Sequence, residues 1–342
     1  MTFRGVLNAL TFAIVVLLLW LLRDELVRAW ELLGRVDLWL LALIIPLQGL
    51  SYYASGATMF SFLKQRGHMS RVTGWDTTRM ALELNFVNHI LPTAGVSGAS
   101  YMTWRLSKLG VGTGRATLVQ VVRFAAIFGS FILLLMLAVL LVTLDNGINR
   151  FTILTSSALV SGLLIGAMIV WYVIDSERRL NIFSGWIARA VNWISSVVFR
   201  IKKPLISKKR IKHFLDELQD DYRALKKNPK LLGRPFVWGV IFNITEVGLF
   251  FLAFLSLGVV VNPAIILIAL GVAAAVGTFL VTPGGAGGYE AVMVLVLTTS
   301  GVSGAIALAG VLLARVILIL LTIGSGYFFY HQALKKYGRH PA

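Results

Sequence analysis

The sequence of 342 residues contains no cysteine and few acidic residues. Without cysteine, disulfide bonds, thiolate metal sites and cysteine nucleophiles are excluded. The 15 Asp and Glu stand against 32 Lys and Arg, which gives a formal net charge of +17. Such a charge can indicate nucleic-acid binding, but here the basic residues lie in the links between apolar runs, as they do in membrane proteins. We therefore expect no nucleic-acid partner.

Motifs for cofactors are also lacking. The glycine-rich stretch GVGTGR at 110–115 has no Walker Lys-Ser/Thr and no strand before it, so we expect no nucleotide site there. No alternating strand pattern of an outer-membrane barrel is visible. Because no catalytic constellation is recognisable either, we expect neither a cofactor, a metal nor an enzymatic activity.

Long apolar runs dominate what is present. The mean hydropathy is +0.81, and several runs reach the ~20 residues that a helix needs to cross a bilayer. The sequence predicts an all-α polytopic protein, with 1–342 forming a single integral membrane domain in the cytoplasmic membrane of a prokaryote. The expected spans are 6–22, 38–63, 115–143, 151–174, 235–257 and 304–333.

The charges of the links predict the orientation. The segment 175–234 carries fifteen Lys and Arg, so we expect it to be a cytoplasmic amphipathic segment. The links 144–150 and 258–262 carry little charge and are expected outside. The stretch 23–37 balances acids and bases and is expected to lie on the outer surface as an amphipathic helix. Six crossings then place both termini inside.

Two further segments start and finish on the same side of the membrane under this scheme. They are interrupted by LPTAGVSGASY (91–101) and TPGGAGGYE (282–290), and in each half a long run starts 21 residues after the proline. The sequence thus predicts an inverted repeat, 38–143 and 235–335, with two re-entrant broken-helix hairpins. Ordinary surface loops between full crossings are the alternative.

Both interruptions are candidate binding sites. Proline ends a helix, glycine allows close backbone approach, and the following helix offers free amide groups that suit an anion such as phosphate. Tight packing of two half-helices is the alternative reason for the glycines. The candidate residues are Pro92, Gly95 and Gly98 in the first loop and Pro283, Gly284, Gly285, Gly287, Gly288 and Tyr289 in the second.

Two arginines lie inside the predicted spans, at equivalent places in the repeat. Arg123 follows Pro92 by 31 residues, and Arg315 follows Pro283 by 32. At ~1.5 Å per residue, each lies roughly 15 Å deep, near the middle of the bilayer. A guanidinium there is costly and matches a phosphate with two hydrogen bonds, so we expect both arginines to bind substrate. A structural ion pair with Glu246 or Glu290 is the alternative.

Other polar side chains inside the membrane are candidates for supporting roles. We expect proton-coupling or counter-ion roles for four residues, namely Glu83, Glu246, Glu290 and His89. Structural hydrogen bonding of His89 and interaction of Glu290 with a helix dipole are the alternatives. The supporting polar residues are Asn85, Asn88, Gln120 and Asn243.

These motifs resemble the transmembrane, flippase-like domain of the lysylphosphatidylglycerol synthase family. The resemblance is carried by NFVNHILPTAGVSGASYMTWRLSKLGVG (85–112), Arg123, GTFLVTPGGAGGYEAVMVLVL (277–297) and Arg315, and it spans nearly the whole chain. Many members have Gly-Glu or Gly-Gly after the first proline, where this chain has GVSGAS. Full-length members also carry a soluble aminoacyl-transferase domain, which we do not expect here.

The resemblance implies movement of a lipid or a lipid-linked head group across the membrane. We therefore predict a flippase or secondary transporter whose partners are membrane lipids, either an anionic phospholipid or a polyprenyl-phosphate-linked substrate. Two alternatives are a membrane-embedded transferase, which could use the acidic pairs at 216–217 and 220–221, and a non-transporting partner of a lipid synthase.

The orientation can be tested by cysteine labelling, because the chain has no cysteine of its own. We expect Ser207→Cys, within the basic segment 175–234, to react with an impermeant maleimide only after the cells are opened. Labelling of this cysteine in intact cells would show that the orientation is wrong.

Overall fold

The computed structural model describes residues 36–67, 72–90, 96–144, 150–176, 228–277 and 287–338, with a few single positions beside these ranges. Within them every regular element is a helix, which confirms the all-α prediction. The α-helices are α3 (Leu38–Ala42), α4 (Ile44–Gln65), α5 (Gly74–Ile90), α6 (Val96–Ser107), α7 (Thr113–Leu144), α8 (Arg150–Ile174), α11 (Gly233–Ser256), α12 (Pro263–Gly277), α13 (Gly288–Thr299) and α14 (Gly304–Tyr337); the 3-10 helix η1 covers Pro229–Leu232.

Four helical stretches are long and apolar enough to cross a membrane: Leu38–Gln65, Arg115–Leu141, Pro229–Ser256 and Gly304–Tyr337. They coincide with four of the predicted spans, and α8 forms a helix over the fifth, 151–174. The predicted span 6–22, nearly all of the helix 23–37 and the acidic pairs at 216–217 and 220–221 lie outside the described residues. Most of the basic segment 175–234 also lies outside them.

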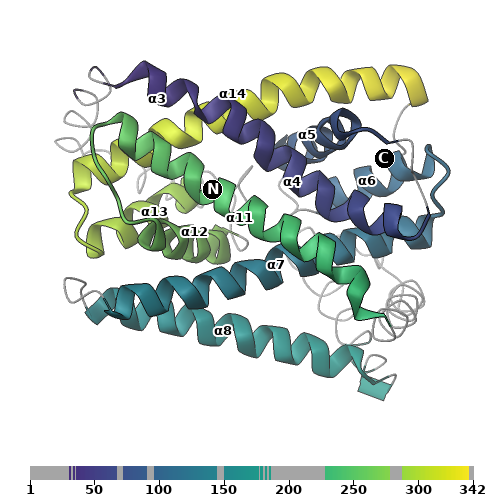
Figure 1. The fold of residues 1–342 in the computed structure, drawn as a ribbon, viewed down its shortest axis with the longest axis horizontal. Coiled ribbons are helices and arrows are strands. Elements are labelled where there is room, and N and C mark those ends of the chain that lie inside the picture. The colour runs from purple at the N-terminus through teal and green to yellow at the C-terminus, as the bar shows by residue number, and fades with distance from the viewer. Residues whose placement is uncertain are drawn as a thin grey trace, which may run out of the picture.

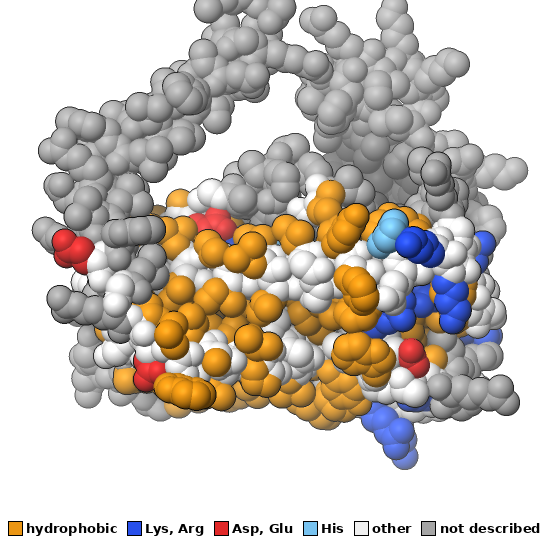
Figure 2. All heavy atoms as spheres, turned by 90° about the horizontal axis from the view of Figure 1, so that it is seen from above, with side chains coloured by type: hydrophobic (Ala, Val, Ile, Leu, Met, Phe, Trp, Pro, Cys, Tyr) orange, Lys and Arg blue, Asp and Glu red, His pale blue; other side chains and the backbone are white. Residues whose placement is uncertain are grey.

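The surface of the described part suits a bilayer. Figure 2 shows hydrophobic side chains across the middle of one face and Lys and Arg gathered at one end. Large apolar side chains are exposed on the outer faces of several long helices, among them Leu141, Leu154 and Leu320. Exposed apolar bands of this kind are stable against lipid but not against water.

Local sequence signals set several helix ends. Thr73 and Asp76 cap the start of α5: the Thr73 backbone N–H donates to Asp76 Oδ2 at 3.1 Å, and the Asp76 N–H donates to Thr73 Oγ1 at 3.2 Å. At the start of α3, Asp37 Oδ1 accepts the Trp39 N–H at 2.9 Å. Gly258 follows the end of α11 with a φ of 78°, a conformation that glycine adopts without strain.

The helices of the two halves pack in matching pairs. In the first half, α4 and α6 each pack against both α5 and α7. In the second half, α11 and α13 each pack against both α12 and α14 in the same way. Across the halves α4 packs against α11, α5 against α14, and α12 against α7. In Figure 1 the short helices α5 and α6 lie toward one end of the long helices, and α12 and α13 lie toward the other.

Small residues allow the closest of these crossings. At Gly239 on α11, an added Cβ would lie 2.6 Å from the carbonyl oxygen of Ala126 and 2.7 Å from Ser130 Oγ, both on α7. Asn243, one turn later, donates from Nδ2 to Ser130 Oγ at 2.9 Å and to the Ile127 carbonyl at 3.0 Å. The predicted supporting residue Asn243 therefore joins α11 to α7, as polar side chains commonly do between membrane helices.

We expect Gly239→Ala to destabilise the protein, because the added methyl group meets backbone that cannot move away easily. Overpacking of this kind costs about 1–3 kcal/mol. Gly166→Ala on α8 is the matched control, since no atom of the described residues lies within 4 Å of its added Cβ. Thermal unfolding in detergent should show a lower midpoint for Gly239→Ala alone, and equal midpoints for the two variants would contradict the close crossing.

Candidate functional site

Arg123 is a buried cation on the inner face of α7, with a side chain only 7% exposed. Its Nη2 donates to Ser55 Oγ on α4 at 3.2 Å, and its guanidinium carbon lies 5.5 Å from the centre of the Phe124 ring. Its Nε has no hydrogen-bond partner, and within the described ranges no carboxylate forms an ion pair with it. This side chain is therefore incompletely satisfied.

Gln120 extends the same unsatisfied polar patch by one helical turn. Its side chain is buried, its Nε2 contacts Met59 Sδ on α4 at 3.4 Å, and its Oε1 has no partner among the described residues. Buried polar groups are rarely left without a partner, and those that are often mark a bound water, ion or ligand. The α4–α7 contact thus holds two side chains, Arg123 and Gln120, that can still bind a polar group.

Arg315, on α14, has a different environment. Its Nε donates to Glu290 Oε1 at 2.6 Å, and each side chain of this ion pair is 13% exposed. The guanidinium carbon lies 4.5 Å from the centre of the Tyr289 ring. Glu290 also accepts the Gly287 backbone N–H through Oε2 at 2.6 Å, which closes the first turn of α13. The structure therefore pairs Arg315 with a carboxylate, as the alternative interpretation expected.

Glu246 lies where α11 crosses α4. Ser51 Oγ donates to Glu246 Oε1 at 2.6 Å. On the same part of α4, Tyr52 forms a hydrogen bond with Thr322 of α14. Glu246 and His89 both lie within electrostatic range of Arg315, whose ion pair is with Glu290.

The sequence positions explain this difference between the two halves. Ser55 precedes Arg123 by 68 residues, and Glu246 precedes Arg315 by 69. Glu290 follows Pro283 by seven residues, and the residue seven after the proline in the first loop is Ala99. Serine and alanine thus occupy the places in the first half where the second half has its two glutamates. Sequence reasoning treated the two arginines as equivalent and missed this asymmetry, which aligning the two halves would have revealed.

Glu83 is fully buried and is held by two arginines. Its Oε1 accepts from Arg79 Nε at 3.2 Å, and its Oε2 accepts from Arg105 Nε at 3.1 Å and from the Tyr101 hydroxyl at 2.9 Å. Arg105 in turn lies 4.3 Å from the centre of the Tyr337 ring on α14. Of the two roles that the sequence suggested for Glu83, this geometry favours the counter-ion. Arg105 and Tyr101 were not identified from the sequence as site residues.

The polar side chains near the first loop make hydrogen bonds within α5 and, at Asn88, between α5 and α6. Asn88 Oδ1 on α5 accepts the Gly98 backbone N–H of α6 at 2.9 Å, and an added Cβ at Gly98 would lie only 2.3 Å from that oxygen. Asn85 Nδ2 donates to the Ala81 carbonyl at 2.8 Å, and His89 Nδ1 lies 2.9 Å from the Asn85 carbonyl. At Gly98 the geometry favours the packing interpretation over direct contact with a ligand.

Five of the predicted loop residues lie outside the described residues, namely Pro92, Gly95, Pro283, Gly284 and Gly285. Gly287 and Gly288 are described, and they start α13, with a φ of 88° at Gly287. The binding role of the two loops therefore stays a prediction.

Comparison with known proteins identifies a family. The family model described as "Lysylphosphatidylglycerol synthase TM region" matches residues 8–326, which is most of the chain and includes both arginines and both loops. Comparison with curated proteins and with solved structures gave no significant match. The protein is thus an integral membrane protein, and the chain belongs to the lysylphosphatidylglycerol synthase transmembrane-region family.

Proposed function

We propose that the protein is a flippase or secondary transporter that moves an anionic lipid, or a lipid-linked head group, across the cytoplasmic membrane of a prokaryotic cell. Membership of a lipid-related membrane family supports a lipid substrate. The proposal depends most on the environment of Arg123. This cation is only 7% exposed inside the helix bundle and has no carboxylate partner in the described ranges.

An unpaired charge inside a membrane protein is costly, so a site that keeps one needs a compensating function. Among the described residues, Arg123 Nε has no hydrogen-bond partner, and Nη2 donates one hydrogen bond, to Ser55 Oγ. A phosphate oxygen pair could accept from both nitrogens at once, which is the geometry that guanidinium groups favour. Gln120 Oε1, which has no partner in the described part of the chain, could accept from a hydroxyl of the same head group. An anionic head group would thus supply the negative charge and the hydrogen-bond partners that Arg123 and Gln120 need.

Arg315 would have a second and conditional role. Its Nε is occupied by Glu290, so an anion could bind there only after this carboxylate is displaced or neutralised by a proton. Glu290 and Glu246 are then the residues that could couple lipid movement to protons. In this proposal Arg123 binds the head group first, and the Arg315–Glu290 pair opens during transport.

The proposal includes the inverted repeat with two re-entrant hairpins. Helix lengths support it: α5, α6, α12 and α13 have 17, 12, 15 and 12 residues. At ~1.5 Å per residue each is shorter than the ~30 Å apolar core of a bilayer, so none of them would cross it alone. The matching helix pairs of the two halves, with their short helices toward opposite ends, also support this arrangement (Figure 1). We further propose that the protein transports without catalysing a reaction.

We expect Arg123→Gln to reduce lipid translocation in reconstituted vesicles by about tenfold or more, because two charge-assisted hydrogen bonds are lost. Arg123→Lys keeps the charge but not the planar fork, so it should retain partial activity. Ser55→Glu is the sharper variant, because it leaves the arginine in place and copies the carboxylate found at Glu246 in the second half. It should inactivate transport by occupying the guanidinium.

Ser55→Ala is the matched control, since it removes one hydrogen bond and adds no charge; it should translocate at close to the parental rate. Thermal unfolding of each variant checks that it is folded. If folded Arg123→Gln and Ser55→Glu both translocate lipid at the parental rate, Arg123 has a structural role and the proposal is wrong.

A further inference from the structure

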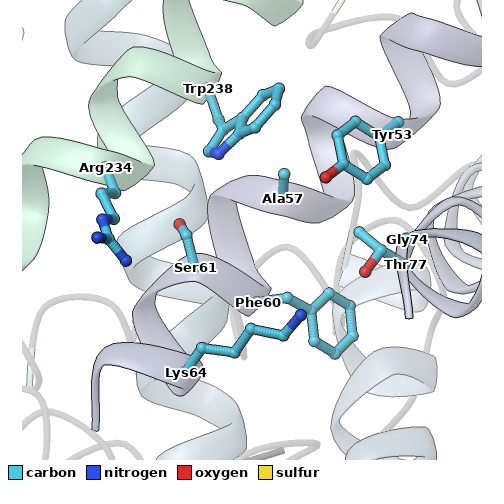
Figure 3. Close-up of a pocket in the computed structure, with 9 residues that line it drawn as sticks. All are labelled: Tyr53, Ala57, Phe60, Ser61, Lys64, Gly74, Thr77, Arg234 and Trp238. Carbon is cyan, nitrogen blue, oxygen red and sulfur yellow. The ribbon is translucent and has the colours of Figure 1, made fainter. Parts of the chain in front are cut away.

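A polar pocket lies on the face of α4 that meets α5 and α11, and Arg123 is not among the residues that line it. Its volume is about 310 Å³, and Figure 3 shows the residues around it. It is lined by two cations, Lys64 and Arg234, by the hydroxyl side chains of Ser61 and Thr77, and by three aromatic side chains, Tyr53, Phe60 and Trp238.

The pocket lies at one end of the membrane-crossing helices. Lys64 is in the last turn of α4, and Arg234 is in the first turn of α11. This is the end of the molecule at which Lys and Arg gather (Figures 1 and 2), and the charge pattern of the links places it at the inner membrane surface. Anionic lipids attract basic groups at that surface.

Both cations have N–H groups that are available for hydrogen bonds to a ligand. Lys64 Nζ donates to the Val72 carbonyl at 2.8 Å, which uses one of its three protons. Arg234 has no hydrogen bond or ion pair with any residue in the described ranges. In Figure 3 Lys64 extends from α4 with its amino group beside Phe60, and Arg234 extends from α11 on the other side of Ser61. The described residues that line the pocket include these two cations and no carboxylate, which favours an anion there.

The aromatic wall favours a ligand that is partly apolar. Tyr53 and Trp238 meet edge to face, with ring centres 5.1 Å apart, and Trp and Tyr are typical of the level of lipid head groups. Beside Trp238, Val237 is 57% exposed on the outer face of α11. A volume of about 310 Å³ is at the small end of ligand sites, enough for a head group but not for acyl chains.

We propose that this pocket binds the phosphate head group of an anionic phospholipid at the inner membrane surface, through Lys64 and Arg234, while the acyl chains lie along the apolar outer face of α11. The proposal rests on the proposed lipid-transport function and deepens it, because it assigns a docking site distinct from the Arg123 site. The lipid would bind here from the inner leaflet before its head group enters the bundle.

The test is lipid binding to the purified full-length protein, measured by native mass spectrometry during titration with dioleoyl phosphatidylglycerol or dioleoyl phosphatidylcholine. The double variant Lys64→Gln/Arg234→Gln should bind phosphatidylglycerol about tenfold more weakly than the parent, because two charge-assisted contacts are lost. The control Arg66→Gln/Lys230→Gln removes the same charge at the same end from residues that do not line the pocket, and it should bind like the parent.

Competition separates a lipid from a free anion. If millimolar inorganic phosphate displaces phosphatidylglycerol from the parent, the pocket is a phosphate-ion site and the proposal fails. It also fails if the two double variants bind phosphatidylglycerol equally, or if phosphatidylcholine binds the parent as tightly.

A failure of the proposed function would look different. In that case Arg123→Gln would fold and translocate lipid normally, whereas loss of phosphatidylglycerol binding in Lys64→Gln/Arg234→Gln would still support the pocket. Conversely, if this double variant binds phosphatidylglycerol normally and Arg123→Gln is inactive, the proposal for the pocket is wrong and the proposed transport function still stands.

Discussion

Compensation of buried positive charge is the constraint on which this structure depends. Water is absent from the bilayer core, so each cation inside it needs a carboxylate, a backbone carbonyl or a ligand. Two groups of arginines meet this requirement with internal ion pairs, because Glu83 pairs with Arg79 and Arg105, and Glu290 pairs with Arg315. Arg123 differs, since in the described ranges it contacts the Ser55 hydroxyl and the Phe124 ring but no carboxylate. Our proposal assigns the missing compensation to a ligand.

The two halves share a helix arrangement but differ in chemistry. Matching helix pairs bring Arg123 and Arg315 to comparable places, on α7 and α14. Where the first half has Ser55 and Ala99, the second has Glu246 and Glu290. In the described ranges Arg123 has no carboxylate partner, whereas Arg315 forms an ion pair with Glu290. A transporter built in this way would have one half that attracts an anion and another that responds to protons. The difference between Ser55 and Ala99 in one half and Glu246 and Glu290 in the other would then determine which arginine binds the head group first.

Much of the fold could be predicted from apolar runs and from proline, glycine and charge between them. The run 151–174 became α8, Arg150–Ile174, and the run 304–333 became α14, Gly304–Tyr337, because unbroken apolar stretches of this length can only be helical in a membrane. The proline-glycine breaks likewise predicted the boundary between α5 and α6. These features are local, so one sequence is enough to reveal them.

The site was predictable only in part, because its contacts join distant segments. Arg123 could be recognised as a candidate because it lies near the middle of a predicted span. The residues close to it in the sequence do not show that its side chain contacts Ser55, or that the side chain of Arg315 contacts Glu290. Lys64 and Arg234 lie 170 residues apart in the sequence, and only the packing of α4 against α11 brings them to one pocket. Glu83 could be recognised as a buried acid but not as the partner of two arginines.

The binding of a lipid head group by Arg123 can be tested most directly with an electron cryo-microscopy map of the protein in nanodiscs of phosphatidylglycerol. We predict density for a head-group phosphate within hydrogen-bond distance of Nε and Nη2 of Arg123, with Ser55 and Gln120 beside it. A map in which protein groups alone satisfy this guanidinium, with no lipid density next to it, would contradict this role of Arg123.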